Sequence, residues 1–130
     1  MKKKIVKLLA VTMASVMLFG GMAFAGINFV DYNLTVGRFN GIGDTEAQKK
    51  NTTGTDGYII SICVGGDYVV DARMVSSSGN GNWTRNVTDN QTRMLPGTEK
   101  QKKGCSVKAR FSNDWNTPVG VNVRGQFMSN

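Results

Sequence analysis

Two cysteines, two tryptophans and a run of lysines are the side chains of this 130-residue sequence with chemistry that could serve a site. Histidine, which titrates near neutral pH and commonly binds zinc, is absent. Its absence excludes Ser/His and Cys/His nucleophile systems and histidine-ligated metal centres. The nine acidic residues are scattered, and no spacing singles out a glycosidase pair or a calcium loop. We therefore expect a protein that is not an enzyme and uses no metal or cofactor.

Cys63 and Cys105 are expected to form one disulfide, since the sequence begins like an exported protein and compartments outside the cytosol are oxidising. The bridge would close a loop of about 42 residues and stabilise the fold by about 4 kcal/mol on the chain-entropy model. The alternative is two buried free thiols. A zinc site is poorly supported because two cysteines without histidine supply too few ligands.

The tryptophans Trp83 and Trp115 are candidate binding residues. Trp83 follows a Ser/Gly/Asn-rich loop, and Trp115 stands among asparagine and aspartate residues at the tip of an expected hairpin. An exposed indole presents a large apolar face with a polar edge, which suits stacking on a carbohydrate or contact with a membrane interface. The alternative for each ring is that it folds back over the core.

Lys100, Lys102 and Lys103 form a third candidate binding feature. A dense positive run attracts anionic cell-wall polymers and lipid head groups by simple charge. The alternative is a solvated loop with no partner.

The first 25 residues have the features of a secretory signal peptide. Lys2, Lys3 and Lys4 precede an apolar stretch over residues 5–19, and alanines at positions 23 and 25 predict cleavage after Ala25. The alternative is a membrane anchor, but Lys7 leaves an uninterrupted run shorter than the roughly 20 residues that span a bilayer. We expect a secreted, extracellular protein consisting of residues 26–130.

Most of the formal charge of +7 belongs to this leader. It carries four of the 16 basic residues and no acid, so the remainder keeps 12 basic and nine acidic side chains, a net charge of +3. So modest a charge on an exported chain gives little support to nucleic-acid binding.

From residue 26 onward the apolar residues recur with period two, and helix-length stretches of period 3.6 are missing. This pattern predicts an all-β fold. Residues 45–51 read as either a short edge strand or one helical turn. About seven short strands separated by turns favour a single antiparallel β-sandwich, with a small barrel as the alternative. The expected strands are residues 30–36, 58–64, 68–75, 83–87, 92–95, 105–112 and 119–124.

Two connections read as hairpin turns. Gly65, Gly66 and Asp67 separate the strands at 58–64 and 68–75, and residues 113–118 separate the last two strands. Each pair is therefore expected to lie side by side in one sheet.

Several features resemble small secreted β-sandwich proteins of Firmicutes, including lactococcin-like bacteriocins. They are the lysine-led start of the chain, the segment 47–52, a strand opening at Tyr58 and the alternation from Gly104 to Asn113. The resemblance covers roughly residues 45–125, implies a Gram-positive source and carries over no binding residue. The chain departs from that group in its cysteine pair and in its C-terminal residues 127–130.

Together these features lead us to expect a secreted, non-enzymatic, bacteriocin-like effector that contacts a cell envelope. The alternative is a secreted module that binds cell-wall carbohydrate or has a structural role. The expected partner is an anionic cell-wall polymer, a membrane surface or a glycan, and not a nucleic acid.

Overall fold

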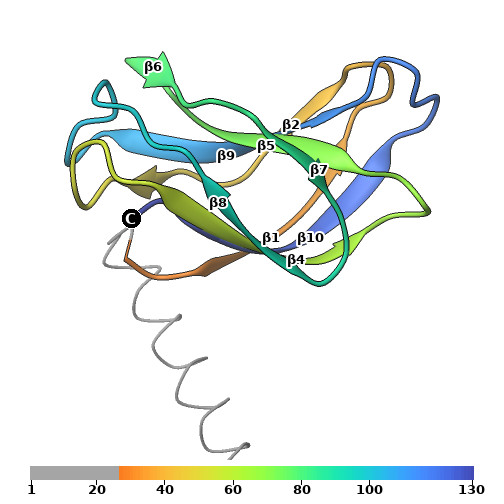
Figure 1. The fold of residues 1–130 in the computed structure, drawn as a ribbon, viewed down its shortest axis with the longest axis horizontal. Coiled ribbons are helices and arrows are strands. Elements are labelled where there is room, and N and C mark those ends of the chain that lie inside the picture. Colours follow the sequence, from red (N-terminus) through yellow and green to blue (C-terminus); the bar gives the residue numbers. More distant parts are fainter. Residues whose placement is uncertain (1–26) are drawn as a thin grey trace, which may run out of the picture.

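The computed structural model describes residues 27–130, which form two antiparallel β-sheets packed face to face (Figure 1). The four-stranded sheet has the order β1 (Val30–Val36), β10 (Val121–Met128), β4 (Gly57–Val64), β8 (Gln91–Leu95). The six-stranded sheet has the order β2 (Ile42–Asp44), β9 (Ser106–Asn113), β5 (Val70–Ser76), β6 (Gly79–Asn80), with β3 (Gln48–Lys49) paired to β9 and β7 (Thr84–Val87) paired to β5. The predicted all-β sandwich is confirmed, and the barrel alternative is wrong because the two sheets do not close on each other.

The core lies between the two sheets, where the apolar residues of the period-two pattern face inward. Tyr32 on β1 and Phe111 on β9 meet across this space with their ring centroids 4.9 Å apart. Alternation therefore predicted the buried faces of β1, β5, β9 and β10 correctly. The fully buried side chains include Val36, Ile59, Val70, Ala72, Met74, Val87, Leu95, Val107, Ala109 and Val123.

Both predicted hairpins are wrong, because each connection carries the chain from one sheet to the other. β4 pairs with β10 and β8, whereas β5 pairs with β9, β6 and β7. Likewise, β9 and β10 lie in different sheets, so the loop 114–120 spans the end of the sandwich. Two strands joined by a short turn can cover each other's apolar faces across the layers as well as pair within one, and the turn residues do not distinguish the two.

The predicted disulfide is also wrong for this fold, since both cysteines are free. Cys63 lies opposite Arg124 near the end of β4. Cys105 packs against the core near the start of β9, and its carbonyl oxygen accepts a hydrogen bond from the backbone N–H of Lys50. Lys50 in turn donates a hydrogen bond to the carbonyl oxygen of Ser129. Ser129 follows Met128, which lies opposite Tyr58 at the start of β4. Cys105 is therefore near the start of β4, whereas Cys63 is near its end. Five strand residues at roughly 3.3 Å each separate these ends, whereas bonded cysteines hold their Cα atoms within about 7 Å.

We expect purified protein to contain two free thiols per chain. Thiol titration after rapid denaturation should give two equivalents, and the intact mass should not rise by two protons on adding reductant. A mass increase of that size in otherwise monomeric protein would contradict the arrangement of β4 and β9 described above.

The signal peptide expected over residues 1–25, with its cleavage after Ala25, lies outside the described residues. Within residues 27–130 no helix is long and apolar enough to cross a membrane.

The segment around β3 holds the last residues of the chain against the sandwich. The side-chain amide of Gln48 donates to the carbonyl oxygen of Phe127 at 2.6 Å, and its side-chain oxygen accepts from the N–H of Ser129 at 2.9 Å. Lys50 is only 1% exposed, and its Nζ donates to the carbonyl oxygens of Ser129 at 2.6 Å and of Thr55. The burial of Lys50 was not predicted from the sequence, because the residues on either side of it are polar.

Candidate functional site: an aromatic tip and a lysine-lined hollow

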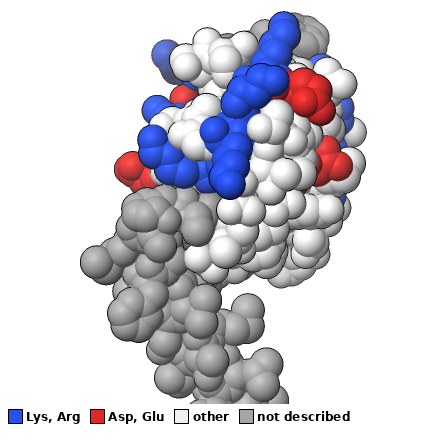
Figure 2. All heavy atoms as spheres, turned by 90° about the vertical axis from the view of Figure 1, so that its left-hand side faces the viewer, with Lys and Arg blue, Asp and Glu red and all other residues white. Residues whose placement is uncertain are grey.

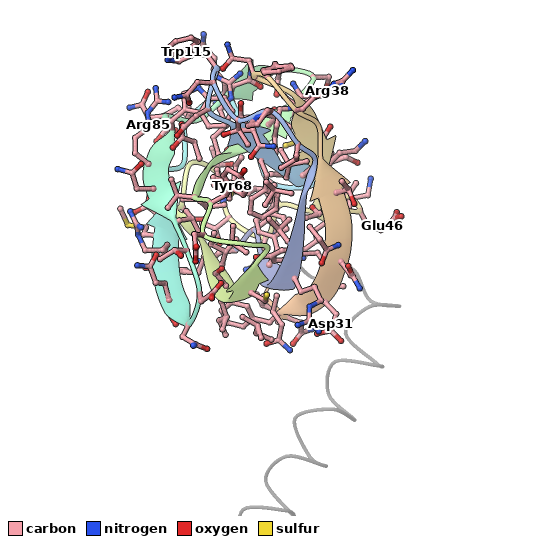
Figure 3. All side chains as sticks on the ribbon, turned by 90° about the vertical axis from the view of Figure 1, so that its right-hand side faces the viewer. Asp31, Arg38, Glu46, Tyr68, Arg85 and Trp115 are labelled. Atoms are coloured by element: carbon pink, nitrogen blue, oxygen red, sulfur yellow. The ribbon has the colours of Figure 1, made fainter. Side chains whose placement is uncertain are left out.

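The structure places the predicted binding residues at opposite ends of the sandwich. Trp115 lies in the loop after β9, and Lys100, Lys102 and Lys103 lie in the connection before β9. The eight residues of β9 separate these ends by roughly 26 Å at about 3.3 Å per residue. Lysine and arginine side chains gather at one end (Figure 2), and Trp115 projects from the other (Figure 3). One flat partner surface therefore cannot touch both.

At the Trp115 end, the loop between β1 and β2 is hydrogen-bonded to the loop between β9 and β10. The N–H of Phe39 donates to the carbonyl oxygen of Thr117 at 2.8 Å, and the N–H of Asn40 donates to that of Asp114 at 3.2 Å. The buried side-chain amide of Asn113 adds bonds to the carbonyl oxygens of Val36 and Gly37. The two loops thus form one unit whose backbone is fixed from both sides.

This unit carries exposed apolar side chains. Trp115 is 74% exposed and Phe39 is 55% exposed, and Val119 is exposed in the same loop as Trp115. The guanidinium of Arg38 lies 5.8 Å from the centre of the Phe39 ring. We call Arg38, Phe39, Trp115 and Val119 the aromatic tip. Of the two readings of Trp115, the exposed one is correct.

The backbone at the tip is unusual. Phe39 has a φ of 51° and Asn40 a φ of 59°, which is the left-handed region. A bulky residue held there costs of order 1–3 kcal/mol, and such residues cluster where function requires a particular presentation. The fold therefore holds Phe39 in a costly conformation that leaves its ring in solvent.

Phe39, Arg38 and Val119 were not predicted from the sequence. A usable signal was present: an aromatic residue in a polar loop bounded by Gly37 and Gly41. A Cβ on Gly41 would lie 2.2 Å from the carbonyl group of Gly37, so the loop can close only with glycine at this position. The exposure of Phe39, however, depends on hydrogen bonds to a loop about 75 residues further along the chain, and no local sequence pattern predicts them.

Trp83 is not part of the core, and its role as a binding residue stays a prediction. It lies just before β7, half-buried on the outer side of the six-stranded sheet rather than in the core. The guanidinium carbons of Arg73 and Arg85 lie 4.3 and 5.7 Å from its ring centre, and Arg85 is paired with Asp71 at 2.7 Å. Because cations occupy its π-face, Trp83 offers a ligand less apolar surface than Trp115 does.

A solvent-open hollow of about 460 Å³ lies on the outer face of the six-stranded sheet. In it, Arg110 makes two hydrogen bonds to Asp44, at 2.8 and 2.9 Å, and these bonds raise the pKa of Arg110. Lys108 lines the same hollow and is exposed. The rest of the lining is mainly polar and includes Ser76, Asn80 and Ser106. The hollow therefore offers hydrogen-bond donors and positive charge.

Among the described residues, no group of three or more potential ligand side chains is arranged to hold a metal ion. Comparisons of the chain with protein-family models, with curated proteins and with solved structures find no match. The resemblance to lactococcin-like proteins stays a prediction, and function must be argued from the two surface features alone.

Proposed function

We propose that the protein is a secreted, non-enzymatic effector that contacts the envelope of a cell, and that the aromatic tip is its point of contact with the lipid bilayer. The observation that carries the proposal is the exposure of Trp115 and Phe39 on two loops that are hydrogen-bonded to each other. An indole and a phenyl ring beside a cationic side chain suit the boundary between lipid acyl chains and head groups.

Rigidity of the tip supports the same proposal. Residues whose backbone is already fixed lose little conformational freedom on binding, so more of the energy of burying their rings appears as affinity. Burying one large apolar side chain is worth about 1.5–3 kcal/mol, and two rings together reach the micromolar to millimolar range that suits a reversible membrane contact.

The second candidate is a module that binds cell-wall carbohydrate. The polar residues Asp114 and Asn116 beside Trp115 favour it, because sugar recognition combines ring stacking with hydrogen bonds. The exposed phenyl ring of Phe39 favours lipid instead, which is why we place the bilayer first.

Trp115 fluorescence tests the bilayer contact directly. In the Trp83→Phe variant Trp115 is the remaining tryptophan, and its emission should shift to the blue on titration with zwitterionic phosphatidylcholine vesicles. Changing Trp115 to alanine in the wild-type chain should weaken vesicle co-sedimentation at least tenfold, equivalent to about 1.4 kcal/mol. The purified protein should also inhibit the growth of susceptible bacteria, and the same variant should lose that inhibition.

Ile62→Ser is the matched control, since Ile62 is 50% exposed on β4 and lies outside the tip. It should sediment with vesicles as the wild type does. Equal losses in the two variants would mean that general surface hydrophobicity drives binding, and the tip would have no special role. Saturable binding to purified cell-wall glycan without any vesicle binding would favour the carbohydrate module.

A further inference from the structure

We propose that the hollow on the six-stranded sheet binds a linear phosphodiester polymer of a polyol, a second envelope component besides the bilayer. The inference rests on the proposed function in assuming that the partner is a cell envelope. Its residues are separate from those of the aromatic tip, so each site can be tested without the other.

Two lysines at the hollow carry charge that no acidic side chain offsets. Lys108 lines the hollow, and Lys49 on β3 lies directly opposite the lining residue Ser106. Directly opposed residues share a face of the sheet, and diagonal neighbours such as Lys49 and Lys108 lie about 7–8 Å apart. Within residues 27–130 the ion pairs are those of Arg85 and Arg110, and neither lysine takes part in one.

A third lysine, Lys100, lies beside β6 but does not line the hollow. The stem of Lys100 lies over Gly79, where a built Cβ would meet its Cδ at 2.7 Å, and its carbonyl oxygen accepts a bond from the Ser78 hydroxyl at 2.7 Å. Gly79 precedes Asn80, which lines the hollow. The lysine charge at the hollow itself therefore comes from Lys108, with Lys49 beside it.

The cationic side chains at the hollow indicate which phosphate compound it binds. Arg110 already donates from Nε and Nη2 to Asp44, so the carboxylate offsets its charge and the lysines carry the unpaired positive charge. Lysines are point charges, and several of them spread around a hollow suit singly charged groups repeated along a chain. The hydroxyl groups of Ser76 and Ser106 and the amide of Asn80 can pair with the hydroxyl groups of a polyol between those charges.

The position of the hollow allows both contacts at once. Its lining comes from the last residue of β2, the end of β5, β6 and residues 106–110 of β9, whereas Trp115 follows the other end of β9. A molecule with its tip in a bilayer would therefore hold the hollow above the membrane surface, where a polymer extending from the envelope can reach it.

The test measures binding of a fluorescently labelled poly(glycerol phosphate) oligomer by anisotropy at low ionic strength. The double variant Lys49→Gln/Lys108→Gln should weaken binding at least tenfold. Lys102→Gln/Lys103→Gln removes the same two charges from exposed lysines that neither line the hollow nor lie opposite a lining residue, and it should change binding less than threefold. Thermal melting of both variants checks that the fold is kept.

Two further measurements distinguish a phosphate polymer from a lipid head group, and the hollow from the aromatic tip. The two double variants should bind equally well to vesicles containing phosphatidylglycerol. If Lys49→Gln/Lys108→Gln weakens vesicle binding as strongly as it weakens polymer binding, the ligand is a lipid head group and the proposal is overturned. Trp115→Ala should bind the polymer normally even where it no longer binds vesicles. Equal losses in both double variants, or no binding of the oligomer by the wild type, would also overturn the proposal.

Discussion

Replacing Lys50 with methionine is expected to lower the free energy of unfolding by about 3 kcal/mol. Methionine retains most of the buried aliphatic stem but cannot donate hydrogen bonds. The carbonyl oxygens of Ser129 and Thr55 would then lose their charged donor in a place that water barely reaches. A bond from a charged group is worth about 1.5–3 kcal/mol, and stranded buried acceptors add to the loss. Urea denaturation followed by fluorescence measures the difference.

The control is the adjacent residue. Lys49→Met makes the same chemical change at an exposed position and should alter the free energy of unfolding by no more than about 0.5 kcal/mol. Equal losses of unfolding free energy in the two variants would show that the hydrogen bonds of Lys50 do not stabilise the C-terminal end of β10.

The pH dependence of the Lys50 effect gives a second readout. Burial lowers the pKa of Lys50 below its ordinary value of 10.5, against the opposing charge of Asp56. Between the two pKa values the unfolded chain binds more protons than the folded one, so stability from this group rises with pH. The stability difference between wild type and Lys50→Met should therefore grow as pH rises toward 10.5 and then level off. A difference that shrinks over this range would contradict the burial of the ammonium group.

Gly125→Ala is expected to have a comparable effect, a loss of about 3 kcal/mol or a failure to fold. Gly125 is buried in the middle of β10, opposite Tyr32 on β1 and beside a register shift in its pairing with β4. A Cβ at this position would lie 2.1 Å from the carbonyl oxygen of Ile60 and 2.7 Å from the hydroxyl of Tyr32. The first contact is with the backbone and cannot be relieved by a rotamer change, so two strands must separate.

Gly65→Ala serves as the control for Gly125→Ala. The nearest atoms to a Cβ on Gly65 are those of Asn122 at 3.4 Å, which is ordinary contact. Its free energy of unfolding should stay within about 0.5 kcal/mol of the wild type. Denaturant titration of the two variants side by side decides whether the close approach at Gly125 is what makes glycine necessary there.

The candidate site shows where prediction from the sequence stops. The exposure of Trp115 was one of two open readings, because its polar neighbours are typical of a loop tip. The hollow was not foreseen, since it needs Lys108 and Ser106 from β9 beside Asn80 from β6, and Lys49 across the sheet. Nor was the buried Lys50, whose partner Ser129 lies 79 residues further along the chain.

The amino-acid sequence by itself determined the seven longer strands and the buried side of β1, β5, β9 and β10, because period-two alternation is a local property of the chain, but it did not predict the short strands β2 and β6. It also placed most of the turns, since glycine and asparagine permit the backbone angles that turns require. Only the tertiary structure decided the partners: β1 beside β10, β4 and β5 in different sheets, and Cys63 far from Cys105. The physical reason is that backbone hydrogen bonds are the same for any two strands. Pairing is therefore set by the total apolar surface that all the strands bury together, and no single segment carries that information.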